Sequence, residues 1–252
     1  ATVIAQGIAF LSAAVYLFRN KEAAQFDFRL RSFAIDLGQL KALCRLGVPF
    51  VVQQFMITGS ITFVNAQINA YDVIASAVDS VGAKLNSVAN IVTGAISTAS
   101  ATMIAQSFGA RKLDRVKHAH WACMIICMGW WVILSACYLL LPRQIFGLFT
   151  SDPEVLDMAP KFLRLALIWL LSLCSMCAPF SLVEGVGYAS FNLIVGLLDG
   201  VVARIGLSML LGHFFGLYGF WLGSGLAGFV TTICMGIYYL SGRWKNRQLV
   251  SD

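Results

Sequence analysis

The chain has 252 residues, of which 59% are hydrophobic and only 12% are charged, and its mean hydropathy is +0.78. A soluble domain has roughly 25% charged residues to cover its surface, so this composition excludes an ordinary soluble protein. The formal net charge is +6, but the basic residues gather in short loops without interleaved aromatic side chains, which argues against a nucleic-acid-binding protein.

Apolar stretches long enough to cross a bilayer follow one another along the chain. The first is residues 1–18, and a polar linker at 19–45 follows, in which the weakly amphipathic piece 34–44 is expected to form a helix on the membrane surface. The chain then predicts six complete spans, at residues 46–69, 73–107, 119–141, 162–183, 189–211 and 217–240. A basic tail at 242–252 ends the chain.

The third stretch is longer than a bilayer needs. As one helix it would reach about 52 Å, against about 30 Å of hydrocarbon, so it must protrude, tilt or break. Gly82 and Gly94 are the candidate weak points, and Pro179 is expected to bend the fifth span.

Lys and Arg are unevenly distributed between alternate loops. If each span crosses once, 13 of the 18 basic residues fall on one side, in the linker, the 109–117 loop and the tail. Positive loops mark the cytoplasmic side, so we expect these three segments, and therefore the C-terminus, in the cytoplasm. The pattern predicts a multi-pass protein of the cell membrane, with the lipid bilayer as its surroundings.

Two spans carry polar stripes. In the second span Gln54 and Asn65 share a narrow arc with three further polar residues, and in the third span Asp79, Asn86 and Asn90 share another. Amide and carboxylate side chains are costly against lipid, so the stripes must face protein or water. They form either one wall of a solvated cavity for a substrate or an ion, or hydrogen bonds between helices.

Asp79 is the strongest functional candidate, because an intramembrane carboxylate is costly unless it is used. Lys84 lies in the same span and is included among the cavity candidates, although its side chain points away from the arc. Asp199 and Arg204 form a second polar group in the sixth span, as a structural pair or part of a pathway. Five residues place them about 140° apart on an α-helix, so a direct pair is not guaranteed.

The sequence contains no recognisable catalytic or metal-binding constellation, so neither an enzyme nor a metalloprotein is expected. The seven cysteines lie almost entirely in apolar runs, and Cys174 and Cys177 lie within a predicted span. A buried cysteine behaves as a small hydrophobic residue. No phosphate-binding loop of the P-loop type is present, which excludes a subunit that carries its own ATP-driven motor.

Several motifs resemble the multidrug and toxic compound extrusion (MATE) family of the MOP superfamily. The second span opens with L-G-V-P-F-V-V-Q-Q, and A-Q-S-F-G-A-R-K-L-D-R-V-K resembles the family's cytoplasmic loop signature at Gln106, Gly109, Ala110 and Arg115. E-G-V-G-Y and G-L-Y-G-F-W-L-G resemble its last two helices. The resemblance implies an all-α polytopic bundle at 46–241, one half of a two-bundle transporter, with residues 1–18 as the last helix of a preceding N-terminal bundle.

The resemblance also implies a function: a secondary antiporter that exports drugs or other cationic amphiphilic compounds by alternating access, coupled to Na⁺ or H⁺ and using no other cofactor. Some cation-coupled relatives carry an acid in the middle of the fifth span, but residues 169–177 contain none. Asp79 is the candidate substitute, on the grounds of its chemistry and not of a family motif. Two alternatives stay open, a flippase for lipid-linked precursors or polysaccharides and a membrane fragment that only packs or assembles.

Overall fold

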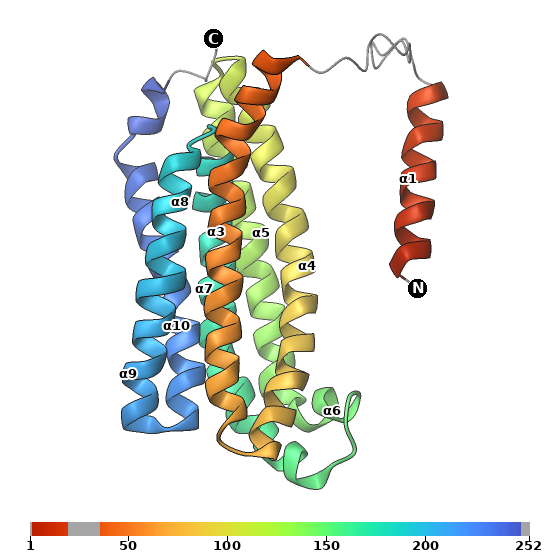
Figure 1. The fold of residues 1–252 in the computed structure, drawn as a ribbon, viewed down its shortest axis with the longest axis vertical. Coiled ribbons are helices and arrows are strands. Elements are labelled where there is room, and N and C mark those ends of the chain that lie inside the picture. Colours follow the sequence, from red (N-terminus) through yellow and green to blue (C-terminus); the bar gives the residue numbers. More distant parts are fainter. Residues whose placement is uncertain (1, 20–35, 248–252) are drawn as a thin grey trace. The chain divides into compact units, whose positions relative to one another are not determined.

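The computed structural model describes residues 2–19 and 36–247, and every regular element in these ranges is a helix (Figure 1). The chain divides into two compact units at residues 44 and 45. The first unit contains α1 (Thr2–Arg19), the helix predicted at residues 1–18. The linker predicted at 19–45 lies mostly outside the described residues.

The second unit, residues 45–252, is a bundle of long helices that run back and forth (Figure 1). Its elements are α3 (Leu37–Asn69, of which Arg45 onward belongs to this unit), α4 (Val73–Gly109), α5 (Leu113–Leu140), the short α6 (Pro142–Gly147), α7 (Pro153–Gly185), α8 (Ala189–Leu197), the π-helix η2 (Leu198–Ile205), α9 (Gly206–Phe215), α10 (Leu217–Leu240) and the 3₁₀-helix η3 (Arg243–Asn246).

Six helices are long and apolar enough to cross a membrane, and they correspond to the six complete spans expected from the sequence. The third span is one unbroken 37-residue helix, α4, so of the three possibilities for this long stretch it does not break, at Gly82, at Gly94 or elsewhere. The piece at 34–44 was expected to be helical, and its residues from Leu37 onward form the first part of α3.

The connections alternate between the two ends of the second unit (Figure 1). The α4–α5 connection, the α7–α8 connection and η3 share one end, and the α3–α4 turn, α6 and the α9–α10 turn share the other. The basic segments at 109–117 and 243–247 therefore lie at the same end of the bundle, as the distribution of Lys and Arg predicted.

The centre of the unit is α7, which packs against α4, α5 and α10. Its buried side chains include Leu170, Cys174 and Ala178, each with no solvent exposure. Cys174 thus occupies the core as a small apolar side chain, which is the role expected for a cysteine in a span.

Glycines bring the last helices close together. A Cβ atom at Gly219 would lie 1.9 Å from the carbonyl oxygen of Leu211, and one at Gly223 would lie 2.6 Å from the backbone of Ser208. The tight packing of α10 on α9 therefore requires glycine at these two positions. Gly196 has the same function against Gln53 of α3, where an added Cβ would lie 2.3 Å from the side chain. Close approach through small residues is typical of packing between membrane helices.

The segment after α10 folds back onto the bundle. Trp244 of η3 is only 1% exposed, and its indole Nε1 donates a hydrogen bond to the carbonyl oxygen of Tyr239 at 3.1 Å. Arg247 lies 3.8 Å from the ring centroid of Tyr188, at the start of α8, and donates to the carbonyl oxygen of Gly187. The basic tail is thus attached to the α7–α8 connection through these described contacts.

Candidate functional site

A cavity of about 270 Å³, partly open to the outside and lined by both apolar and polar side chains, lies in the second unit between α3, α4, α7, η2 and α10. Its ionisable lining residues are Asp79 and Arg204. Asn65, Asn86 and Asn90 contribute amides, and Phe162, Trp169 and Trp221 contribute aromatic surfaces. From Asp79 to Asn90 the cavity follows α4 for about 16 Å, at 1.5 Å per residue. It is therefore elongated along the helices.

Asp79 lies in the second turn of α4, half-buried, and its carboxylate Oδ1 accepts a hydrogen bond from the indole Nε1 of Trp221 at 3.1 Å. The Trp221 ring packs edge-on against Phe162, with 4.9 Å between centroids. Phe162 in turn covers Gly82, where an added Cβ would lie 2.1 Å from the ring. Aromatic packing thus fixes the donor that orients the carboxylate. Among the described residues no cation forms an ion pair with Asp79.

Three of the predicted amides reach the cavity. Asn86 lies two turns from Asp79 on the same face of α4, and Asn90 follows one turn later. The Nδ2 of Asn90 donates to the carbonyl oxygen of Asn86 at 2.8 Å. Asn65 enters from α3. The narrow arc that the sequence predicted on α4 therefore faces this space.

Gln54 and Lys84 do not line the cavity, unlike the sequence prediction. Gln54 lies on the same face of α3 as Asn65 but eleven residues earlier, about 16 Å along the axis, and it is exposed and bonds to Thr58 at 3.4 Å. Periodicity gives the face of a helix but not how far a cavity extends along it. Lys84 points away from the arc, and its Nζ lies 5.5 Å from the centroid of the Phe149 ring.

Gln53, the neighbour of Gln54 in the sequence, forms a buried hydrogen bond between helices. Gln53 is 6% exposed, and its Nε2 donates to Oδ1 of Asn192 at 3.2 Å. This bond links α3 to α8 across the close approach at Gly196. The polar stripe of the sequence does not include Gln53, because Gln53 lies about 100° away from the arc that Gln54 begins.

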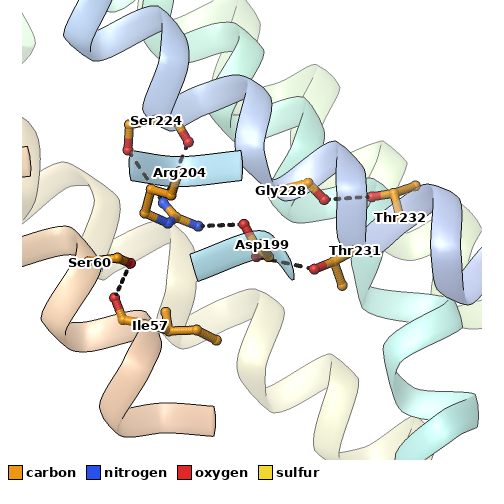
Figure 2. Close-up of polar contacts among 8 residues, drawn as sticks. All are labelled: Ile57, Ser60, Asp199, Arg204, Ser224, Gly228, Thr231 and Thr232. Carbon is orange, nitrogen blue, oxygen red and sulfur yellow. Dashed lines mark hydrogen bonds and ion pairs between the residues drawn. The ribbon is translucent and has the colours of Figure 1, made fainter. Parts of the chain in front are cut away.

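Asp199 and Arg204 form a direct ion pair of 3.2 Å within one helix (Figure 2). On an α-helix they would point about 140° apart, but residues 198–205 form a π-helix, in which each backbone bond joins residues five apart. The wider turn places the two side chains on the same side. Both are buried, with side chains 6% and 10% exposed.

The ion pair is supported by two hydroxyl groups of α10 (Figure 2). Thr231 donates to Oδ2 of Asp199 at 3.1 Å, and Nη1 of Arg204 donates to Oγ of Ser224 at 3.3 Å. The Nε of Arg204 has no hydrogen-bond partner among the described residues. Arg204 and Ser224 also line the cavity, so Arg204 faces the same space as Asp79, while its partner Asp199 lies behind the lining.

The polar residues further along α4 connect helices. Ser97 and Ser181 of α7 are 2.9 Å apart, and Ser100 donates to the carbonyl oxygen of Ala119 on α5 at 3.5 Å. Thr93 donates to the carbonyl oxygen of Ala89 in its own helix. Interhelical packing, rather than cavity lining, accounts for this part of the stripe.

The loop signature lies elsewhere, at the opposite end of α4 from Asp79. Gln106, Ala110 and Arg115 line a second cavity, of about 390 Å³, and Gly109 ends α4. Among the described residues no group of three or more His, Cys, Asp or Glu side chains is placed to hold a metal ion.

The fold and the cavity define a class: a multi-pass, all-helical membrane protein with a polar site inside its bundle. The family model described as MatE matches residues 49–210, which is more than half of the chain, and the chain belongs to this family. The members of the family are transporters rather than enzymes.

Curated relatives agree with this assignment. The chain is 26% identical to the probable multidrug resistance protein YoeA of Bacillus subtilis over 258 residues, which cover 99% of this chain and 54% of YoeA. It is 20% identical to a probable multidrug resistance protein NorM of Thermotoga maritima, covering 96% of this chain and 53% of that protein. The chain thus spans about half the length of the curated relatives it matches.

Solved structures share the fold. A mutant of the Vibrio cholerae MATE transporter VcmN superposes with a TM-score of 0.83 at 18% identity, covering 98% of this chain and 56% of the other. A MOP superfamily transporter from Pyrococcus furiosus superposes with a TM-score of 0.79 at 20% identity, covering 92% and 53%. The described bundle therefore has the fold of one half of such transporters.

Proposed function

We propose that the chain is the C-terminal half of a cation-coupled efflux transporter, and that Asp79 binds the coupling cation. The observation that carries this proposal is a carboxylate inside a span, hydrogen-bonded to Trp221 but without a cationic partner among the described residues. An unpaired carboxylate at membrane depth is costly. Binding Na⁺ or H⁺ removes that cost, and releasing the ion restores it.

The charges around the cavity favour a cation. Arg204 is neutralised by Asp199, so the three ionisable side chains Asp79, Asp199 and Arg204 leave one net negative charge when all are ionised. Amide oxygens and aromatic faces add to the attraction, because both interact favourably with cations. The site thus combines a single anionic group with neutral groups that attract positive charge.

The size of the cavity favours an ion over a drug. At about 270 Å³ it lies below the roughly 300–1,000 Å³ of sites for drug-sized ligands. A partly hydrated ion fits this space, whereas a cationic amphiphilic substrate needs more room. We expect that room to lie between this bundle and a preceding N-terminal one, with the transporter in the cell membrane and the C-terminus in the cytoplasm.

A flippase for lipid-linked precursors is the weaker candidate, because its cavity would need free cations to hold a pyrophosphate. Arg204 is the cationic residue among the described lining, and it is already paired with Asp199. No described feature of the bundle favours this function over cation-coupled export.

The test is transport by the full-length protein in proteoliposomes, with a cationic dye and separate Na⁺ and pH gradients. We expect Asp79→Asn to abolish the efflux driven by one of these gradients. Lys84→Gln removes a charge from the same helix outside the cavity and serves as the matched control, with efflux near that of the wild type. Retention of the wild-type gradient dependence in Asp79→Asn would rule out the proposed role.

A further inference from the structure

The second cavity, at the α4–α5 connection, is a candidate binding site outside the Asp79 region. It has a volume of about 390 Å³ and lies between the end of α4 and the start of α5. Its polar lining includes Lys112, Arg115, His118 and Gln106. Two of these residues, Gln106 and Arg115, belong to the loop signature. The proposed cation binding at Asp79 does not explain why the chain has this signature.

The cavity carries an uncompensated positive charge. Within residues 2–19 and 36–247, neither Lys112 nor Arg115 forms an ion pair. The nearby carboxylate of Asp114 contacts Lys117 at 3.0 Å instead, and neither of these two residues lines the cavity. The lining thus combines two permanent cations with a histidine. This combination of side chains attracts an anion.

The backbone adds to this attraction. α5 begins at Leu113, and no side chain caps its first turn. The N–H groups of Leu113 and Asp114 have no partner among the described residues, whereas that of Arg115 donates to the carbonyl oxygen of Lys112 at 3.1 Å. The two unbonded N–H groups and the helix dipole favour an anion beside Lys112, which lines the cavity.

The lining is amphipathic along the helix axes. The cations lie at the connection, whereas Met103, Ala119 and Ala122 form the other end of the lining. Met103 is 58% exposed, and it lies about 10 Å along α4 from Ala110, while Ala122 lies about 15 Å along α5 from Lys112. A free inorganic anion uses only the charged end, so the apolar end indicates a ligand with a hydrocarbon part.

An apolar track continues from the cavity along α5. Ile125 and Ile126 lie one turn beyond Ala122 and are 67% and 55% exposed, and Ile133 further along is 56% exposed. Residues three and four apart share a helix face, so these side chains extend the apolar end of the cavity towards the middle of the span. An acyl chain that starts at the cavity finds hydrocarbon contacts along this track.

We propose that this cavity binds an anionic phospholipid, with the phosphate between Lys112, Arg115 and the start of α5, and with acyl chains along Met103, Ala122 and the track beyond. Basic pockets between membrane helices suit such headgroups. The site gives the loop signature a physical role: Gly109 and Ala110 close the turn between the helices, while Gln106 and Arg115 face the lipid.

The test is lipid binding to the purified full-length protein, measured by native mass spectrometry during titration. The probes are phosphatidylglycerol, phosphatidylcholine with the same acyl chains, and glycerol phosphate. We expect phosphatidylglycerol to bind most tightly. Lys112→Gln with Arg115→Gln should weaken its binding about 30-fold, because each Lys or Arg near an anionic lipid contributes roughly fivefold.

The matched control is Lys161→Gln with Arg164→Gln, which removes the same charge from the first part of α7, towards the other end of the bundle and outside the cavity lining. This variant should bind phosphatidylglycerol within about twofold of the wild type, since single surface charges far from a site contribute little. An equal loss in both double variants would mean that the lipid responds to overall charge, which overturns the site.

Ala122→Trp tests the apolar end without changing the charge. This substitution should weaken the binding of phosphatidylglycerol and leave the binding of glycerol phosphate unchanged. If glycerol phosphate binds as tightly as phosphatidylglycerol and Ala122→Trp changes neither, the cavity is a site for free anions and the lipid proposal fails. Equal binding of phosphatidylglycerol and phosphatidylcholine to the wild type also overturns it, whatever the folding of the variants.

Discussion

The Asp199–Arg204 pair provides the sharpest test of the structure, because the π-helix in the sixth span places the two side chains on the same side. The two side chains are 6% and 10% exposed, and their contact is 3.2 Å. We consider Asp199→Leu, Arg204→Met and the double variant. Each single change leaves one buried charge without its partner, which costs about 3–5 kcal/mol.

The double variant removes both charges together. Replacing a buried ion pair with apolar residues of similar size is often neutral, so the main remaining losses are the hydrogen bonds with Thr231 and Ser224, about 1 kcal/mol each. The sum of the two single losses in unfolding free energy therefore exceeds the loss in the double variant by several kcal/mol. We expect a coupling free energy of at least about 3 kcal/mol from the double-mutant cycle.

The assay is reversible unfolding of the full-length protein in mixed micelles, followed by tryptophan fluorescence, with the free energy of unfolding compared across the four proteins. Additive losses, within about 0.5 kcal/mol, would show that the two side chains do not contact each other. That outcome is expected of a regular α-helix, on which they point about 140° apart, and it would refute the π-helical geometry.

The remaining predictions concern packing. Gly219→Ala should lower the free energy of unfolding by more than about 2 kcal/mol, because the added methyl group meets a backbone carbonyl, whereas Gly129→Ala, with open space around it, should change little. Trp244→Ala should cost about 3–5 kcal/mol and the exposed Trp121→Ala far less; equal losses would contradict the attached tail. Cys174, fully buried, should resist maleimide until the protein is unfolded, and rapid labelling would contradict its place in the core.

The sequence was sufficient to predict the spans and much of the cavity wall. Apolar stretches of about 20 residues are a strong signal, and all six complete spans are confirmed by long apolar helices. Asp79, Asn86 and Asn90 recur at intervals of seven and four, which an α-helix turns into one face. Because α4 is regular over its whole length, that rule held, and the three side chains line the same cavity.

Periodicity failed where the backbone or the neighbouring helices changed the geometry. The contact between Asp199 and Arg204 depends on a π-helix, and an angle of 100° per residue assumes that none is present. Trp221 was missed because a tryptophan in a span is usually a packing or interfacial residue, and only the approach of α10 to α4 shows that it donates to Asp79. The ion pair thus depends on a local change of helix type, and the Trp221 hydrogen bond depends on a tertiary contact; a regular 100° periodicity indicates neither.

The polar stripe of α3 extends beyond the cavity, and this extension bears on how a substrate would reach the site. Asn65 lies in the cavity, but Gln54, Thr58 and Thr62 on the same face are exposed in the described bundle. Thr62 bonds only to the backbone of Thr58. Such a row cannot face hydrocarbon without cost, so it requires water or another protein surface. In the proposed transporter, a facing bundle would enclose this row of side chains as a wetted passage that leads towards Asp79.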